Sequence, residues 1–569
     1  MMSTVIKSSL FVSCLIFAIF GIASARLNAA LDGSSTDTRG AVASESSVCS
    51  HVGIDLLKIG GNAADALVGT VLCIGVVAMY HSGIGGGGFM LVHAPNGSFE
   101  FVDFRETAPA AAFEDMYEND TDLSLYGGLA SGVPGELRGL ERLHDQYGVL
   151  CWRDVVKPAV RLARYGFAVT EDLVSYMKSA TSDGYDFLTQ DSTWALDFAP
   201  NGTRVGPGDT MTRKRYADTL ELVGDFGVNA FYTGAIANAT IQALTAKNGT
   251  MTVQDLSNYT IAVREPAQIQ YRDFTLTSCS APSSGIVAMS VMKILEGYDM
   301  GNDQEVNLST HRLDEAIRFG YGERANLGDP LFVDELDKYQ QEMIGTETAE
   351  TIRTKISDDR TQNVSAYNAE GLESLDTPGT SHISVADDSG LAITLTTTVN
   401  LLFGSRLMVP ETGVIMNNEM NDFSIPGSSN AFGYVPSPSN FIRPGKRPLS
   451  SISPSIATRN GSLFFITGSA GGSRILTAVI QNLWHVLDQG LSAPEAIASP
   501  RLHDQLQPNS VSFEYAYDNG TTQYMKERQH NVTWIAPGQS TANGIRILDN
   551  GTFEAAGEPR QQNSGGFAV

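Results

Sequence analysis

The chain has 569 residues, of which 42% are hydrophobic and 18% charged, a composition typical of a globular protein with a large core. Its formal net charge is −25 at pH 7, and no long cluster of Lys or Arg occurs. This balance argues against nucleic acid or an anionic membrane surface as a partner, because both carry negative charge.

The N-terminus has the pattern of a secretory signal. Lys7 precedes an apolar run over residues 10–22, and Ala-Ser-Ala at 23–25 provides small residues for cleavage. We therefore expect residues 1–25 to be a signal peptide. The apolar run is short for a membrane span, but an uncleaved signal that anchors the protein is an alternative that stays open.

Twelve Asn-x-Ser/Thr sites favour passage through the secretory pathway. They predict a eukaryotic glycoprotein that is extracellular or vacuolar. The acceptor residues are Asn96, Asn119, Asn201, Asn238, Asn248, Asn258, Asn307, Asn363, Asn460, Asn519, Asn531 and Asn550.

Two helices are predicted near the start of the mature chain, over residues 46–59 and 63–80. Gly60 and Gly61 end the first helix, and Asn62 can cap the second. Cys49 and Cys73 lie at similar distances from this turn, so antiparallel helices would bring them together as a disulfide. Two buried thiols are the alternative.

The other cysteines suggest no cross-link. Cys14 leaves with the signal, and Cys151 and Cys279 are expected to be free thiols. No cysteine spacing resembles a metal site, and we expect neither a metal nor a cofactor.

A glycine-rich loop follows the second helix. Residues 81–88 contain G-x-G-x-x-G, but the motif follows a helix and opens a strand, whereas a dinucleotide site needs the reverse order. Close backbone packing is the better explanation of these glycines. Strands are predicted at 89–93 and 98–104. Arg105 then emerges as either a solvated charge or a clamp for a carboxylate.

Further helices and strands are predicted from the spacing of apolar residues and from the Gly and Pro residues that end them. Helices are predicted from Pro134 to Gly148, over 152–165 and over 311–327, and a strand over 269–276. Residues 345–376 are polar without apolar periodicity, so they predict an exposed loop.

Thr380 marks a change of pattern. It opens a predicted strand directly after a Pro-Gly loop, and a turn at 387–390 leads into a second strand over 391–399. Cleavage of the Gly379–Thr380 bond would give Thr380 a hydroxyl nucleophile and a free α-amine as its own base. Taken alone, the stretch is explained more simply as a β-hairpin after a linker.

The C-terminal part adds a loop and a glycine turn. Residues 425–448 are rich in Pro, Ser, Asn and Gly, and long loops of this kind are often lids. A predicted strand at 463–467 and helix at 473–487 flank glycines at 468–472. These could present N–H groups to an oxyanion at the helix N-terminus.

In their order along the chain, these motifs closely resemble the γ-glutamyltransferase family, from about Gly40 to Val569. The matching segments are the glycine loop, 103–109, Thr380, 398–400, 417–423, 448–451 and 470–472.

The resemblance implies an N-terminal nucleophile hydrolase fold, an αββα sandwich of two stacked sheets between helical layers. It also implies self-cleavage at Gly379–Thr380. A large subunit, 26–379, and a small subunit, 380–569, would remain together as one intertwined domain.

The resemblance also implies residue roles. Thr380 attacks the γ-carbonyl of glutathione or another γ-glutamyl compound, Thr398 hydrogen-bonds to Thr380, and the N–H groups of Gly471 and Gly472 hold the oxyanion. The γ-glutamyl enzyme then reacts with water, an amino acid or a dipeptide.

A second set of residues would bind the donor. The α-carboxylate is assigned to Arg105, Ser450 and Ser451, and the α-ammonium to Asn400, Glu419 and Asp422.

Two positions depart from some family members. Leu402 and Phe432 stand where those members carry tyrosines, so a hydroxyl contact of the lid is missing. The behaviour of the lid and the balance of hydrolysis against transfer therefore stay open.

Two other functions were weighed. Another self-processing amidase of the same fold would have no need of Arg105, Glu419 and Asp422, since an aliphatic acyl group carries no zwitterion. A secreted binding glycoprotein without activity would have no need of all four of Thr380, Thr398, Gly471 and Gly472.

Overall fold

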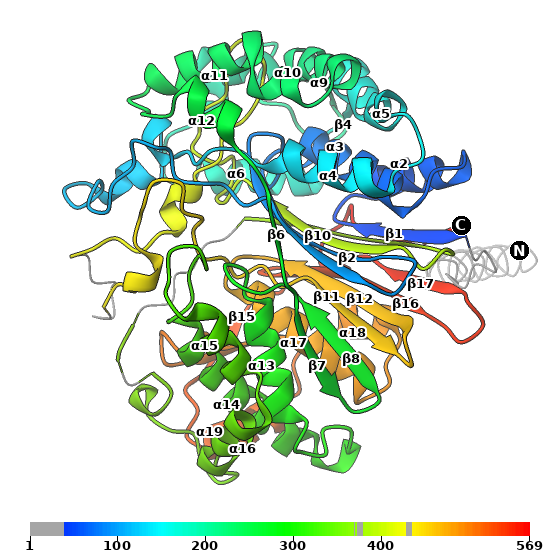
Figure 1. The fold of residues 1–569 in the computed structure, drawn as a ribbon, viewed down its shortest axis with the longest axis vertical. Coiled ribbons are helices and arrows are strands. Elements are labelled where there is room, and N and C mark those ends of the chain that lie inside the picture. Colours follow the sequence, from blue (N-terminus) through cyan, green and yellow to red (C-terminus); the bar gives the residue numbers. More distant parts are fainter. Residues whose placement is uncertain (1–38, 369, 373–378, 428–434) are drawn as a thin grey trace, which may run out of the picture.

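The computed structural model describes residues 39–368, 370–372, 379–427 and 435–569, and shows two stacked β-sheets between two layers of helices (Figure 1). Both sheets are antiparallel throughout. The strand order is β18-β1-β9-β10-β2-β3-β6 in the first sheet and β17-β16-β12-β11-β8-β7 in the second. The expected αββα architecture is confirmed.

The strands have the following bounds. Those of the first sheet are β1 Gly40–Ser44, β2 Gly87–His93, β3 Phe99–Asp103, β6 Ala262–Arg264, β9 Ser381–Asp387, β10 Ala392–Thr398 and β18 Gly565–Ala568. Those of the second sheet are β7 Ala267–Tyr271, β8 Phe274–Ser278, β11 Ser455–Arg459, β12 Ser462–Ala470, β16 Thr541–Ile547 and β17 Phe553–Ala556. Two small sheets contain β13 Leu502–His503, β14 Val511–Glu514 and β15 Val532–Ile535, and β4 Phe167–Ala168 and β5 Thr210–Met211.

The helices fall into two groups by the core to which they contribute. Over the first sheet lie α2 Ser47–Lys58, α3 Ala63–Val77, α4 Glu136–Tyr147, α5 Trp152–Tyr165, α6 Glu171–Ala180, α7 Phe187–Gln190, α8 Ser192–Phe198, α9 Lys214–Phe226, α10 Asn229–Tyr232, α11 Gly234–Thr245 and α12 Val253–Asn258. Over the second lie α13 Gly285–Leu295, α14 Val306–Arg324, α15 Leu336–Met343, α16 Thr346–Lys355, α17 Arg474–Leu487, α18 Ala493–Ala498 and α19 Asn519–Glu527. Short 3₁₀ turns are η1 Thr121–Ser124, η2 Gly128–Ala130, η3 Asp303–Glu305, η4 Val364–Ala366, η5 Glu419–Asp422 and η6 Pro438–Asn440.

Alternation along the first sheet separates the two cores. Met90 and Val92 belong to the core beneath the first helical layer, whereas Phe89 and Leu91 belong to the core shared with the second sheet. Because successive side chains of a strand point to opposite faces, β2 is apolar on both of its faces. The first sheet is therefore buried between helices and the second sheet.

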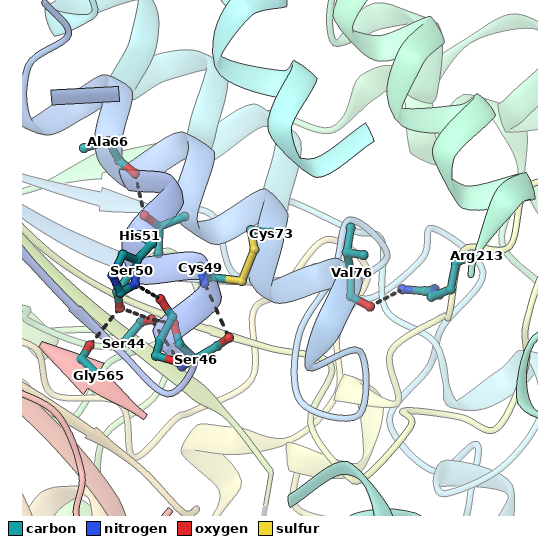
Figure 2. Close-up of a disulfide and its surroundings, with 12 residues drawn as sticks. Ser44, Ser46, Cys49, Ser50, His51, Ala66, Cys73, Val76, Arg213 and Gly565 are labelled. Carbon is teal, nitrogen blue, oxygen red and sulfur yellow. Dashed lines mark hydrogen bonds between the residues drawn. A yellow bond between two sulfur atoms is a disulfide. The ribbon is translucent and has the colours of Figure 1, made fainter. Parts of the chain in front are cut away.

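The disulfide is confirmed. Cys49 on α2 is bonded to Cys73 on α3, their Cα atoms are 5.3 Å apart, and Figure 2 shows the bond joining the two helices. Ser46 caps α2, and Asn62 forms a capping box with Asp65 at the start of α3.

Two sequence predictions were wrong. Residues 346–355 form helix α16 and not a loop, because Ala349 and Ile352 give it a short buried face that is too narrow to show as a periodic pattern. The single strand expected over 269–276 is the hairpin β7–β8, which turns at Arg272 with φ 53°. That turn contains no Gly, Pro or Asn, and Asp273 is its only common turn residue.

Several expectations fall outside the described residues. These are the signal peptide at 1–25, Phe432 and the middle of the loop at 425–448. Within the part of the chain that the structure describes, no helix is both long and apolar enough to span a bilayer.

Candidate active site

Thr380 directly precedes β9, an inner strand of the first sheet. This strand pairs with β1 on one side and with β10 on the other. In the intact chain, Oγ1 of Thr380 donates a hydrogen bond to the carbonyl oxygen of Gly379, and Oγ1 of Thr398 donates to the same oxygen at 3.0 Å. The carbonyl of the bond expected to break is therefore polarised by two hydroxyl groups.

The backbone around Gly379 accepts only glycine. Its φ is +129°, and an added Cβ would lie 2.1 Å from the carbonyl oxygen of Asn400. The N–H of Asn400 donates to Oγ1 of Thr398 at 2.6 Å, which directs the Thr398 hydroxyl proton toward Gly379. The expected hydrogen bond from Thr398 to Thr380 itself stays a prediction for the cleaved chain.

The glycine loop supports this centre by close packing, as expected. A Cβ on Gly86 would lie 2.0 Å from the carbonyl oxygen of Thr398, and one on Gly88 would lie 2.1 Å from that of Thr396. No larger residue fits there, so the loop lies directly against β10.

A small polar pocket opens beside Thr380 and collects the expected donor-binding residues. Arg105, which follows β3, donates from Nη1 to Glu419 and from Nη2 to Asp422, both on η5. Arg105 is only 1% exposed, so it is not a solvated surface charge. The pocket is lined by Arg105, Gly379, Thr380, Thr398, Asn400, Glu419, Asp422, Ser450, Ser451, Ile452, Gly472 and Ile475.

The pocket can accept both charges of an α-amino acid. Oε2 of Glu419 has no hydrogen-bond partner among the described residues, although it is buried, and is an open acceptor for an ammonium group. Nδ2 of Asn400 donates to the carbonyl of Asn418 at 2.9 Å, which holds the amide in place and leaves Oδ1 as an acceptor. The guanidinium of Arg105 is the matching cation for a carboxylate.

Ser450 and Ser451 are held in place by an arginine that was not predicted from the sequence. Arg324 of α14, 5% exposed, donates from Nη2 to Oγ of Ser451 at 3.1 Å and from Nε to Oγ of Ser284 at 2.9 Å. The Ser284 hydroxyl in turn donates to the carbonyl of Ser450. An arginine in a helix carries no motif, so only its burial reveals this role.

Gly471 and Gly472 lie between β12 and α17. Within the described part of the chain, neither N–H donates to a backbone carbonyl. Gly472 borders the pocket of Thr380, and both residues precede the N-terminus of α17. The arrangement can hold an oxyanion.

A second hollow, larger than the polar pocket beside Arg105, also borders Thr380. Its walls include His81, Tyr176 and Leu402 together with Gly471. Nδ1 of His81 lies 2.9 Å from a carboxylate oxygen of Glu45. Leu402, which stands where some family members carry a tyrosine, thus borders the site, while His81 and Tyr176 were not foreseen.

Two buried acids lie beneath the glycine loop. Neither carboxyl oxygen of Glu106 has a hydrogen-bond partner among the described residues, and burial raises its pKa to about 8. Burial also raises the pKa of Glu136, whose Oε2 accepts from Thr397 at 2.8 Å. With its raised pKa, Glu106 keeps its proton at neutral pH and adds no negative charge beside Arg105.

Comparisons with known proteins agree with this geometry. The pattern of the gamma-glutamyltranspeptidase family matches residues 49–568. The chain is 58% identical over 543 residues to the glutathione hydrolase proenzyme of Arthroderma benhamiae, with 93% of each chain covered. It is 52% identical over 534 residues to the glutathione hydrolase of Aspergillus flavus, covering 93% of this chain and 89% of that one.

Solved structures give the same fold. The Helicobacter pylori gamma-glutamyltranspeptidase is 30% identical with a TM-score of 0.52, over 56% of this chain and 92% of that one. A cephalosporin acylase from Bacillus halodurans reaches a TM-score of 0.83 over 94% and 96% of the two chains, but at 24% identity this likeness concerns the fold alone. The family pattern and the curated relatives together show that this chain belongs to the gamma-glutamyltranspeptidase family.

Proposed function

We propose that this enzyme is a glutathione hydrolase and γ-glutamyltransferase. It would cleave the γ-glutamyl bond of glutathione and its conjugates, and pass the γ-glutamyl group to water, an amino acid or a dipeptide. The observation that carries the proposal is the meeting of Thr380 with the buried trio Arg105, Glu419 and Asp422 in one pocket. A γ-glutamyl donor carries both an α-carboxylate and an α-ammonium group, and this trio offers partners for each.

Maturation would begin in the intact chain. Oγ1 of Thr380 attacks the carbonyl carbon of Gly379, the C–N bond breaks, and an ester links the two residues. The amine of Thr380, freed as the C–N bond breaks, receives the hydroxyl proton. Water then hydrolyses the ester, which releases the carboxylate of Gly379 and restores the hydroxyl of Thr380. The products would be a large subunit, 26–379 after removal of the signal at 1–25, and a small subunit, 380–569, held together as a heterodimer.

Turnover would use the freed amine. The α-amine of Thr380 takes the proton of the hydroxyl as Oγ1 attacks the γ-carbonyl, and its ordinary pKa of about 7.7–8.0 suits a general base. Gly471 and Gly472 donate to the oxyanion, and the leaving amine departs with the proton. The γ-glutamyl ester on Thr380 is then opened by water or by an acceptor amine.

The expected location of the mature protein is the extracellular space or the vacuole. The signal pattern and the glycosylation sites support passage through the secretory pathway. A retained signal would add a membrane anchor.

The test is N-terminal sequencing together with a γ-glutamyl anilide assay on one purified sample. We expect a second N-terminus at Thr380 and release of the aniline. Thr380→Ala should remain a single, inactive chain, and Thr380→Ser should process more slowly. Two mature chains from the Ala variant would refute the role of Thr380.

A further inference from the structure

A second cluster of reactive side chains lies in the helical layer over the second sheet, between α14 and the turn after α19 (Figure 1). His311 and Glu315 are four residues apart on α14 and therefore share one face of that helix. His530 lies between α19 and β15. One potential ligand atom from each of these three buried residues lies within 4.8 Å of the others.

Two of the three side chains, His311 and Glu315, are oriented by hydrogen bonds of their outer atoms. Nε2 of His311 lies 2.8 Å from the carbonyl oxygen of Ser357, which can only accept, so the ring proton belongs on Nε2. Oε2 of Glu315 accepts from the Tyr367 hydroxyl at 2.7 Å.

His530 lies beside an acid. Its Nδ1 is 2.9 Å from Oδ2 of Asp314, an ion-pair distance, although the two atoms are not aligned as a hydrogen bond. An ionised Asp314 at this distance favours the imidazole proton on Nδ1 by charge attraction. The inner atoms, Nδ1 of His311, Nε2 of His530 and Oε1 of Glu315, then present only lone pairs to one another. Oε1 of Glu315 has no hydrogen-bond partner among the described residues.

The distances between the inner atoms fit a small cation. Nδ1 of His311 and Nε2 of His530 are 2.8 Å apart, and Nε2 of His530 is 4.0 Å from Oε1 of Glu315. Ligands at about 2.0–2.2 Å from a tetrahedral Zn²⁺ are separated by about 3.3–3.5 Å, between these two values. Two imidazole lone pairs facing each other at this distance repel unless a cation lies between them. The carbonyl of Ser357, which accepts from Nε2 of His311, is the kind of partner that orients metal-binding histidines.

We propose that His311, Glu315 and His530 bind one Zn²⁺ or a similar divalent ion, with water in the fourth position. Two imidazoles and a carboxylate form an N/O ligand set that zinc favours. The ion could arrive through a hollow whose wall includes His530, Asn509 and Asn531. The nearby Arg318 is paired with Asp504 at 2.7 Å, which offsets its repulsion of a cation.

The site would have a consequence for the matured protein. His311 and Glu315 precede Gly379, whereas His530 follows Thr380. If the chain is cleaved there, which rests on the proposed function, the ion joins the large and small subunits. Binding of the ion itself requires neither cleavage nor activity.

The experiment uses the full-length secreted protein without a polyhistidine tag. After treatment with a chelator and reconstitution with ZnSO₄, the bound metal is measured by mass spectrometry, and Tm is measured with and without zinc. We expect about one zinc per chain and a rise in Tm. His311→Gln and His530→Gln should each lower zinc content at least about tenfold, as loss of a ligand requires. His485→Gln, at a buried histidine outside the cluster, should retain the zinc.

Co²⁺ provides a readout that does not depend on the folding of any variant. Cobalt bound to the wild-type protein should show the intense visible absorption of a four-coordinate site. A wild-type protein that binds neither ion, or unchanged zinc content in both ligand variants, would overturn the proposal. The cluster would then hold a shared proton, supplied through a protonated Asp314. Glutathione hydrolysis, assayed on the same samples, separates this result from a failure of the proposed function.

Discussion

At the scale of single residues, the ion pairs of Arg105 bear on how the charged groups of a donor would bind. Its guanidinium already donates to Glu419 and Asp422. In the proposed binding mode, a ligand carboxylate would therefore join a cation that already has two partners, while the ligand ammonium would bind the two acids. The two ion pairs fix the geometry of the trio before a donor arrives.

Arg105→Lys is expected to lower kcat/KM for a γ-glutamyl anilide by about 10–100-fold, because an ammonium cannot hold a carboxylate with two parallel hydrogen bonds. The matched substrate is 4-aminobutyryl anilide, which lacks the α-carboxylate. The substitution should lower kcat/KM for this substrate far less. Gel electrophoresis must first show that the variant is cleaved. An equal loss with both substrates would mean that Arg105 supports the fold and does not contact the donor.

The acids provide the reciprocal control. Asp422→Asn should lower kcat/KM for the γ-glutamyl anilide in the same way. It should leave kcat/KM for glutaryl anilide, which has no ammonium group, nearly unchanged. If the two variants affect the same substrate analogue, the assignment of charges within the pocket is wrong.

Glu106 predicts a pH-dependent stability. Its pKa in the folded chain is about 8, above its ordinary value of 4.5, so the folded state holds the extra proton between these values. The free energy of unfolding should therefore fall as pH rises from about 4.5 to 8, by a few kcal/mol, and level off above. Glu106→Gln should remove this fall, whereas Glu118→Gln, at an exposed position, should not. Parallel Tm curves for wild type and Glu106→Gln from pH 5 to 9 would contradict the assignment.

The site residues that lie within recognisable motifs could be predicted from the sequence, and those outside such motifs could not. Thr380 and Arg105 stand in recognisable segments, and the structure places them in one pocket. Glu106 gains its shifted pKa mainly from burial, and Arg324 and His81 gain their roles from partners more than thirty residues away in the chain. Such long-range contacts leave no local pattern in a single sequence.

At the scale of elements, the ends of helices and strands could be predicted where capping or helix-breaking residues mark them. Helix α3 begins at its predicted cap but ends at Val77, before the expected Tyr80, since no breaker marks that end. Helix α5 was predicted with its observed bounds because Gly166 ends it. Helix α16 and the turn of the β7–β8 hairpin lack such signals, and both were misjudged.

The α2–α3 pair should depend on its disulfide. Replacing both Cys49 and Cys73 with Ser opens a link across 24 residues and should lower the free energy of unfolding by about 3 kcal/mol on the chain-entropy account. Denaturant midpoints with and without reductant measure this effect. Cys151→Ser, at an exposed free cysteine, serves as the control. A double variant that unfolds at the wild-type midpoint would refute the stabilising role.

At the scale of the whole molecule, the two expected subunits are interleaved. In the first sheet, β1 of the large subunit pairs with β9 on one side and β18 on the other, and both of these strands follow Thr380. In the second sheet, β8 of the large subunit pairs with β11 of the small one. Each sheet, and each core that it covers, is therefore built from both sides of the cleavage point.

This interleaving predicts that cleavage does not release the subunits. Separating them would break the β1–β9, β1–β18, β2–β10 and β8–β11 ladders and expose both cores to water, so the chains should part only when the fold is lost. Denaturing gels of the mature protein should show two bands, while size-exclusion chromatography of the same sample should give one peak that survives dilution. A urea series should show subunit separation and loss of near-ultraviolet dichroism at the same midpoint. Release of a folded small subunit below that midpoint would contradict a single intertwined domain.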